Sequence, residues 1–153
     1  MQSRSHSRNL QLRFASPEDA ALIAPMNRQL IADEGHRNSM DILQLGKRMR
    51  DWLQGEYKAV IFEQDDIPIG YALFKREDEF VYLRQLFVSP ENRRQGIARY
   101  ALQWLWGNAW TNDRHIRIDV LVGNGGARAF WHSVGFSEYC VTMEAARPDD
   151  QEL

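Results

Sequence analysis

Three apolar runs in the middle of the chain constrain the fold more than any other feature. YKAVIFE (57–63), PIGYALFK (68–75) and FVYLRQLFV (80–88) are rich in β-branched and aromatic residues, as strands are. Only short acidic segments, 64–66 and 77–79, separate these runs. Because turns this short connect antiparallel neighbours, the sequence predicts three adjacent strands in this region.

One strand and two helices are expected before these three strands. LQLRFA (10–15) alternates between apolar and polar residues, which is typical of a strand. Apolar residues at helical spacing then predict a helix that ends near Gly35 and a second helix that ends near Gly55. The polar loop 33–38 lies between the two predicted helices.

Helices and strands alternate in the last third of the chain. The spacing of apolar residues predicts a helix over about 97–111, a strand over 115–122, a helix around 127–134 and a last strand over 136–145. Two strands that are joined through a helix run parallel, so the strands at 80–88 and 115–122 are expected to form a parallel pair. Separation of such a pair would open a cleft at the strand ends.

Composition limits the classes of protein that the chain can belong to. With 153 residues, 44% of them hydrophobic, one domain over 10–146 is expected, with a disordered start at 1–9 and a frayed tail at 147–153. The formal net charge of -2 argues against a nucleic-acid partner, and no apolar run reaches the roughly 18 residues of a membrane span. One cysteine, Cys140, cannot form an internal disulfide and is expected to be buried. The expected location is cytoplasmic, since no secretory signal is visible.

The segment SPENRRQGIARYAL (89–102) places bare backbone and positive charge at the start of a predicted helix. The first N–H groups of a helix have no partner within it and carry about half a positive charge. Gly96 allows a ligand to approach the backbone, and Ala98 keeps the first turn narrow. Arg93 and Arg94 would attract an anion. The segment is typical of a pyrophosphate site, although a glycine-containing helix start with solvated arginines would have the same pattern.

A second segment, from Asn124 to Phe136, opens the next predicted helix, and Asn124 is a favourable N-cap. Together the two segments resemble the signature of the GCN5-related N-acetyltransferase (GNAT) superfamily, and the order of elements agrees from about Leu10 to Met143. The Arg/Gln-x-x-Gly-x-Gly/Ala loop of that family is matched by Arg93, Gly96 and Ala98. Its Asn-x-x-Ala-x-x-Phe-Tyr-x-x-x-Gly-Phe stretch is matched by Asn124, Ala127, Phe130, Gly135 and Phe136.

The resemblance implies an α/β (α+β) fold. Its central sheet is mixed and mostly antiparallel, with about six to seven strands, a splayed parallel pair and about four flanking helices. Family members usually end in a hairpin, but only one strand fits after Phe136 here, so the presence of a seventh strand is left open. The five tryptophans of the chain, among them Trp104, Trp106 and Trp110 on the helix predicted over about 97–111, cannot all face the core of the domain, and a homodimer is therefore expected.

The resemblance also implies that acetyl-CoA is the co-substrate, with no metal, and that an acetyl group passes directly to the primary amine of a small molecule or, second, of a protein. The alternative is an acyl-CoA-binding sensor or another non-catalytic module. The pyrophosphate would lie on the amides of 94–98, and the pantetheine would pair with the strand backbone at 86–88, where an amide near Phe87 would polarise the carbonyl. The residues expected to bind acetyl-CoA are Leu86, Phe87, Val88, Arg93, Arg94, Gln95, Gly96, Ile97, Ala98, Arg99, Asn124, Ala127 and Trp131.

The proton donor of the family is absent from its usual position. Relatives often carry a Tyr there as the acid for the leaving thiolate, but this chain has Trp131, which cannot supply a proton at useful pH. A thiol with a pKa of about 8.5 leaves tolerably without an acid. Tyr139 on the predicted last strand is the substitute acid that we expect, the alternative being a packed strand tyrosine.

Three residues are candidates for the general base or for amine binding. Asp119 occupies the position of a Glu that some family members carry, although it could instead pair with Arg117 or with solvent. Glu34 and His36 belong to the loop that commonly overhangs the acceptor site in this fold, where they could bind a cationic amine or accept its proton. A solvated loop is the alternative for both. Relatives often carry an acidic residue where this chain has Arg84 and Gln85, in the strand at 80–88. A cation or a neutral Gln there implies a different acceptor, for example one that bears a carboxylate.

Overall fold

The structure is a computed structural model that describes residues 9–35 and 37–149. The predicted disordered start at 1–9 lies outside the described residues except for Asn9. The candidate residue His36 also lies outside them. The chain divides between Leu121 and Val122 into two compact units. The elements are β1 (Leu10–Phe14), η2 (Pro17–Asp19), α2 (Ala20–Glu34), α3 (Ile42–Gln54), β2 (Tyr57–Gln64), β3 (Ile67–Arg76), β4 (Val81–Val88), η3 (Pro90–Asn92), α4 (Ile97–Asn108), β5 (Ile116–Arg117) and α5 (Gly125–Ser133).

The first unit is built on a mixed sheet with the strand order β1-β2-β3-β4-β5. The four strands β1 to β4 are antiparallel neighbours, as the short turns between the last three predict. β5 is parallel to β4 and pairs with it at only two positions, Val81↔Ile116 and Tyr82↔Arg117. The expected splayed parallel pair is therefore confirmed, and the edge of β4 beyond Tyr82 has no strand neighbour among the described residues.

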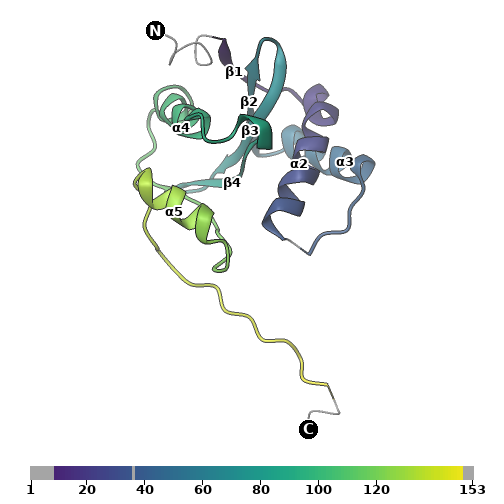
Figure 1. Ribbon diagram of the computed structural model, residues 1–153, viewed down its shortest axis with the longest axis vertical. Coiled ribbons are helices and arrows are strands. Elements are labelled where there is room, and N and C mark those ends of the chain that lie inside the picture. The colour runs from purple at the N-terminus through teal and green to yellow at the C-terminus, as the bar shows by residue number, and fades with distance from the viewer. Residues whose placement is uncertain (1–8, 36, 150–153) are drawn as a thin grey trace. The chain divides into compact units, whose positions relative to one another are not determined.

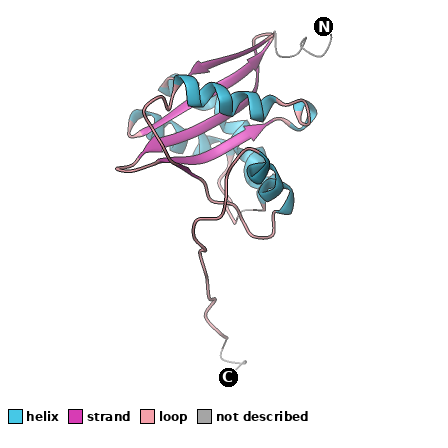
Figure 2. Cartoon of the chain, turned by 90° about the vertical axis from the view of Figure 1, so that its left-hand side faces the viewer, coloured by secondary structure: helices cyan, strands magenta, loops and turns pink. Residues whose placement is uncertain are grey.

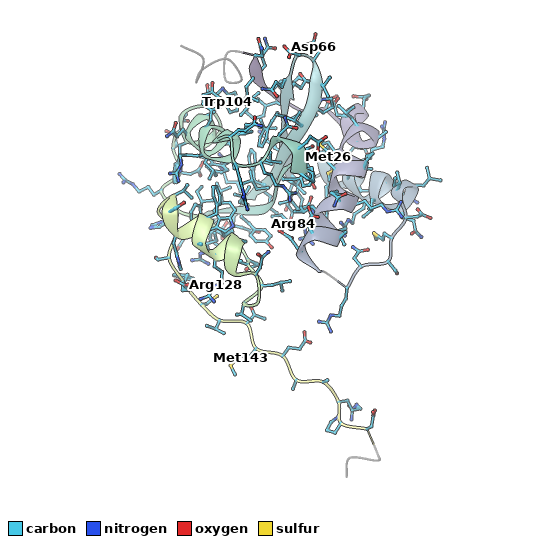
Figure 3. All side chains as sticks on the ribbon, viewed as in Figure 1. Met26, Asp66, Arg84, Trp104, Arg128 and Met143 are labelled. Carbon is cyan, nitrogen blue, oxygen red and sulfur yellow. The ribbon has the colours of Figure 1, made fainter. Side chains whose placement is uncertain are left out.

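Helices cover both faces of the sheet. α2 and α3 lie together on one side of the strands and α4 lies on the other, a relationship that is clear in both views (Figure 1, Figure 2). Figure 3 marks the two sides by Met26 on α2 and Trp104 on α4. Successive side chains of β2 point to opposite faces of the sheet. Ala59 and Ile61 therefore belong to the core under α2 and α3, while the buried Val60 between them faces the other side. The sheet is therefore apolar on both sides, as its continuous apolar runs predict.

Trp104 and Trp106 of α4, and Trp110 just after it, pack largely inside the first unit. Trp110 is 1% exposed and packs edge-on against Phe74, with ring centroids 5.5 Å apart. Trp104 contacts Phe14 at 5.8 Å. Trp106 is 41% exposed and rests its edge on Trp110. The expectation that the three cannot all face the core therefore holds for Trp106.

The sheet has five strands instead of the six to seven that were expected. The predicted strand over 115–122 pairs only at its start, and the predicted strand over 136–145 does not form within the described residues. A strand needs a neighbouring edge that offers a continuous ladder of hydrogen bonds, and β5 with two residues offers none. Cys140, expected to be buried, is exposed, and Met143 lies on an extended segment (Figure 3).

The helix predicted over 97–111 ends at Asn108, three residues early. Across residues 9–35 and 37–149, the helices are too short or too polar to cross a membrane.

Candidate active site

The loop between β4 and α4 presents an open helix N-terminus. Gly96 is the N-cap of α4 and adopts a left-handed conformation, with φ 77° and ψ 11°. Arg94, two residues earlier, is also left-handed, with φ 64°. The first hydrogen bond of the helix runs from the Tyr100 amide to the Gly96 carbonyl at 3.0 Å. The N–H groups before Tyr100 in the first turn have no acceptor within the helix, and a glycine N-cap has no side chain to supply one.

The space in front of this N-terminus is suited to an anion. A Cβ atom added to Gly96 would meet no heavy atom within 4 Å, so the protein itself does not fill the space beside this residue. A left-handed residue next to right-handed ones also gives the backbone conformation that forms anion-binding concavities. The residues at this turn therefore fit a diphosphate group.

The Arg93 side chain was expected to bind the phosphates, but in the structure it bonds groups of the protein itself. Its Nε donates to the Val88 carbonyl at 2.7 Å, and a terminal nitrogen bonds Oδ2 of Asp33 at 2.6 Å. Burial alone would raise the pKa of Asp33, but hydrogen bonds from Arg93 and Gln29 hold this pKa below its usual value. Arg93 therefore fastens the loop to the end of β4 and to the C-terminal turn of α2.

The free edge of β4 presents the backbone of Leu86 and Val88. The Ser89 amide donates to the Ile69 carbonyl of β3 at 2.7 Å. Because amide directions alternate along a strand, the Phe87 amide also points toward β3, and those of Leu86 and Val88 point toward the open edge. The Val88 carbonyl agrees with this pattern, since it accepts from the Arg93 side chain outside the sheet. The open-edge amides nearest to Phe87, where a polarising amide was expected, are therefore those of Leu86 and Val88.

Asp119 lies where β4 and β5 diverge, and its partner is a tyrosine. The Tyr82 hydroxyl donates to Oδ2 of Asp119 at 2.8 Å. Burial and this hydrogen bond raise the pKa of Tyr82 to about 12. The guanidinium of Arg117, the partner considered from the sequence, lies instead 3.9 Å from the centre of the Phe80 ring. Sequence reasoning missed Tyr82, because no local pattern shows which residue of β4 comes to lie beside Asp119 when β5 pairs in parallel with β4.

A polar cluster lies where the sheet meets the helices α2 and α3; it is fully buried at Asn27 and Tyr71 and exposed at Arg84. The Tyr71 hydroxyl donates to Oε1 of Gln85 at 2.8 Å, and a terminal nitrogen of Arg48 donates to Oδ1 of the fully buried Asn27 at 3.2 Å. Burial raises the pKa of Tyr71, and the negative charge of Glu34 acts in the same direction. Glu34 therefore lies within electrostatic range of this cluster, while His36 is not described.

Two arginines of this cluster share one indole ring. The guanidinium carbons of Arg48 and Arg84 lie 4.3 Å and 4.7 Å from the centre of the Trp52 ring. Arg84 also donates to the Tyr57 hydroxyl at 3.2 Å and is marked in Figure 3. Asn27 and Arg48 were missed by sequence reasoning. The sequence features that could have revealed them are the position of Asn27, a polar residue on the apolar stripe of α2, and that of Arg48, four residues before Trp52 on α3.

The second unit contains the other predicted acetyl-CoA contacts. Oδ1 of Asn124 accepts from the Ala127 amide at 3.1 Å, so Asn124 caps α5 as expected. The Trp131 ring is fixed between Phe130 and Phe136, with centroids 5.0 Å and 4.9 Å away. Tyr139, the expected acid, is not on a strand and is 74% exposed.

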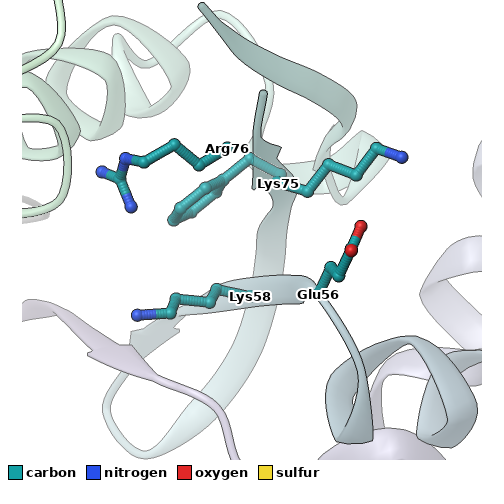
Figure 4. A pocket seen from close by; sticks show the side chains of 5 residues that line it. Glu56, Lys58, Lys75 and Arg76 are labelled. Atoms are coloured by element: carbon teal, nitrogen blue, oxygen red, sulfur yellow. The ribbon is translucent and has the colours of Figure 1, made fainter. Parts of the chain in front are cut away.

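A pocket lies elsewhere on the sheet, lined by Glu56, Lys58, Phe74, Lys75 and Arg76 (Figure 4). It is at the end of β3 that pairs with the start of β4, whereas the open N-terminus of α4 follows the other end of β4. Two of its cations are already paired within the protein, Lys75 with Glu77 at 3.2 Å and Arg76 with Asp113 at 2.7 Å. In the part of the chain that the structure describes, no group of three or more His, Cys, Asp or Glu side chains could hold a metal.

Comparison with known proteins agrees with this architecture. Residues 25–146 match the family model of the acetyltransferase (GNAT) domain. The chain belongs to the GNAT family of acetyltransferases, so the resemblance, the fold class and the enzyme class expected from the sequence motifs, a GNAT-type N-acetyltransferase, are confirmed.

Three solved structures illustrate the similarity of the fold. A possible acetyltransferase from Clostridium difficile 630 has a TM-score of 0.76 at 21% identity, over 92% of this chain and 98% of that one. A predicted acetyltransferase with acetyl-CoA from Clostridium acetobutylicum has a TM-score of 0.73 at 20% identity, over 90% and 96%. The aminoglycoside N-acetyltransferase AAC(6')-Iy in complex with CoA has a TM-score of 0.70 at 18% identity, over 90% and 94%. A search of curated protein sequences finds no match.

Proposed function

We propose that the protein transfers the acetyl group of acetyl-CoA directly to the primary amine of a small molecule. The observation that carries this proposal is the open N-terminus of α4, with left-handed Gly96, directly after the unpaired edge of β4. Two of the similar structures contain CoA or acetyl-CoA. Acetyl-CoA would supply the acetyl thioester.

The chain offers three sets of groups to this co-substrate. The backbone amides of Gln95 to Ala98 would hold the diphosphate, with Arg94 and Arg99 adding positive charge. The backbone of Leu86 and Val88 would pair with the pantetheine as an added strand does. Asn124, Ala127 and Trp131 are the further acetyl-CoA contacts that the family motif implies.

The reaction needs a neutral amine, stabilisation of the carbonyl oxygen and departure of the thiolate. Oδ2 of Asp119, oriented by the Tyr82 hydroxyl, would accept the amine proton as the new C–N bond forms and the C–S bond breaks. An outward-facing amide of Leu86 or Val88 would donate to the carbonyl oxygen. Glu34 would bind the amine as a cation before it reacts, and His36 is the rival base.

Thiol release from acetyl-CoA, measured over a broad panel of primary amines, tests the proposal. Turnover of a small amine together with saturable CoA binding is the expected result. Binding and thermal stabilisation by CoA without turnover of any amine would contradict transfer, and the protein would then be an acyl-CoA-binding module. Failure to bind CoA at all would remove the basis of the proposal.

We further propose that the protein acts in the cytoplasm as a homodimer. The single cysteine gives no internal disulfide, and the exposed Trp106 together with the exposed apolar side chains of the segment 136–145 would be covered by a second copy.

A further inference from the structure

Two arginines on the face of the sheet under α2 and α3 have no carboxylate partner within the described residues. Arg48 and Arg84 lie over the same Trp52 ring, and the hydrogen bonds of their side chains go to neutral groups, Oδ1 of Asn27 and the Tyr57 hydroxyl. Within the described ranges, neither forms an ion pair with a carboxylate. Other arginines of the chain do have a carboxylate within 3.2 Å, namely Arg13, Arg76, Arg93 and Arg128.

This cluster also has more donors than acceptors. Nε of Arg48 is buried and has no hydrogen-bond partner among the described residues; Nδ2 of Asn27 is also buried, and hydrogen bonding of Asn27 lowers the pKa of the nearby Tyr71 hydroxyl. Buried donors in folded proteins are almost always paired, so a surplus of them calls for an additional acceptor. Arg84 is itself exposed, and its charge opposes that of the partly buried Arg48, which increases this need. An anionic group is the acceptor that would satisfy both requirements.

We propose that the acceptor amine carries a carboxylate and that Arg48 and Arg84 bind this carboxylate. This inference rests on the proposed function and names the class of acceptor as amino-acid-like molecules with an amine and a carboxylate. A planar carboxylate fits the fork of a guanidinium in a bidentate arrangement, which a hydrated lysine would not offer. A singly charged carboxylate also suits this position better than a phosphate, since Glu34 contributes negative charge to the same cluster.

The position of Arg84 connects this site to the reaction. The pairing of β3 with β4 shifts between Leu73 and Phe74, which leaves Arg84 as the extra residue of a β-bulge. A bulge redirects the side chain of its extra residue, and here that side chain reaches Trp52 of α3. Leu86, whose backbone lies on the open edge, follows two residues later on the same strand. An acceptor held by Arg84 is therefore bound next to the edge that is proposed to hold the thioester.

Matched acceptors that differ only in charge provide the test. Initial rates would be measured for each amino acid of a panel and for its carboxamide, and the ratio of their kcat/KM values would be calculated. The wild-type protein is expected to prefer the carboxylate by tenfold or more. Arg48→Gln and Arg84→Gln should each bring this ratio close to one while the Kd for CoA stays unchanged. Arg50→Gln is the matched control, because Arg50 is exposed on the same helix and donates to Pro17 instead.

A second measurement separates this inference from the proposed function. Binding of the same acids and amides to the CoA-saturated protein would be measured by calorimetry. Turnover without preference for the carboxylate, or a preference that survives both substitutions, would overturn the inference and leave acetyl transfer intact. Arginine-dependent binding of the acids without turnover would support a carboxylate site at Arg48 and Arg84 and refute the proposed transfer. If a glutamine variant fails to fold, Arg84→Lys keeps the charge and should retain only part of the preference.

Discussion

At the scale of single residues, Gly96 connects backbone conformation to the proposed binding of CoA. Its φ of 77° is unfavourable for residues with a Cβ, but the space around it is empty, so only the backbone opposes a substitution. Gly35 at the end of α2 is similar, with φ 69° and no atom within 4 Å of an added Cβ. The two positions therefore share the same strain and differ in their place in the fold.

Gly96→Ala and Gly35→Ala should each lower the free energy of unfolding by about 1–2 kcal/mol, the cost of left-handed backbone for a residue with a side chain. Only Gly96→Ala should weaken CoA binding, by roughly tenfold or more, since its methyl group stands in front of the helix amides. Chemical denaturation and calorimetry measure the two quantities. Equal loss of CoA affinity in both variants would assign the effect to strain.

Asp119→Asn should lower kcat/KM at neutral pH by about 10²–10⁴-fold, because removal of a general base has an effect of that size. Tyr82→Phe removes only the hydrogen bond that orients Asp119 and should lower kcat/KM by a smaller factor. Since the pKa of Tyr82 is raised to about 12, its own titration should not shape a pH profile measured between pH 6 and 10. An unaltered rate and pH profile in Asp119→Asn would assign the role of base to Glu34 or His36.

Sequence reasoning found the residues whose role follows from local chemistry and missed those defined by distant partners. Gly96 and Asn124 could be identified because glycine and N-cap residues have positional meanings within a few residues. Tyr82, Arg48 and Asn27 could not, since their partners are 21 to 37 residues away in the chain. The ion pair of Arg93 with Asp33, which is 60 residues earlier in the chain, was also missed because the partner is distant.

At the scale of elements, the Arg93–Asp33 ion pair joins the loop before α4 to the C-terminal turn of α2, 60 residues earlier. The acceptor side and the CoA side of the proposed site thus share a side-chain connection. Exposed and half-exposed ion pairs contribute about 0.2–1 kcal/mol to the free energy of unfolding. The main effect of this pair is therefore to hold the loop before α4 in position.

Asp33→Asn should show this contribution as a function of pH. The native state lowers the pKa of Asp33, so the stabilisation is fully present above the unfolded pKa of about 3.9. It is lost as the pH falls through the lower pKa of the folded state. The difference in unfolding free energy between wild type and variant should be constant from pH 5 to 8 and decrease in more acidic buffer. A difference that grows on acidification would contradict the account.

The elements that hydrophobic periodicity defines were predictable, and those that depend on a neighbour were not. α2, α3 and the strands β1 to β4 lie close to their expected ranges, because each carries its own apolar pattern. The strands expected over 115–122 and 136–145 have equally suitable residues. β5 separates from β4 after Arg117, however, and the later segment then has no continuous edge to pair with.

At the scale of the whole molecule, the proposed homodimer gives a direct prediction. The segment 136–145 exposes Tyr139, Val141 and Met143 by 72% or more, and such surfaces are typical of interfaces between chains. Light scattering after gel filtration should give twice the 17.9 kDa mass of one chain. A mass of one chain at the concentrations used for activity would refute the dimer.

The central claim is that the open N-terminus of α4 holds the diphosphate of CoA, and a crystal structure of the CoA complex tests it most directly. The account predicts diphosphate oxygens within hydrogen-bond distance of the backbone amides of residues 95–98, with the pantetheine along Leu86 and Val88. Diphosphate density at another site, such as the pocket lined by Lys58 and Lys75, would contradict the claim.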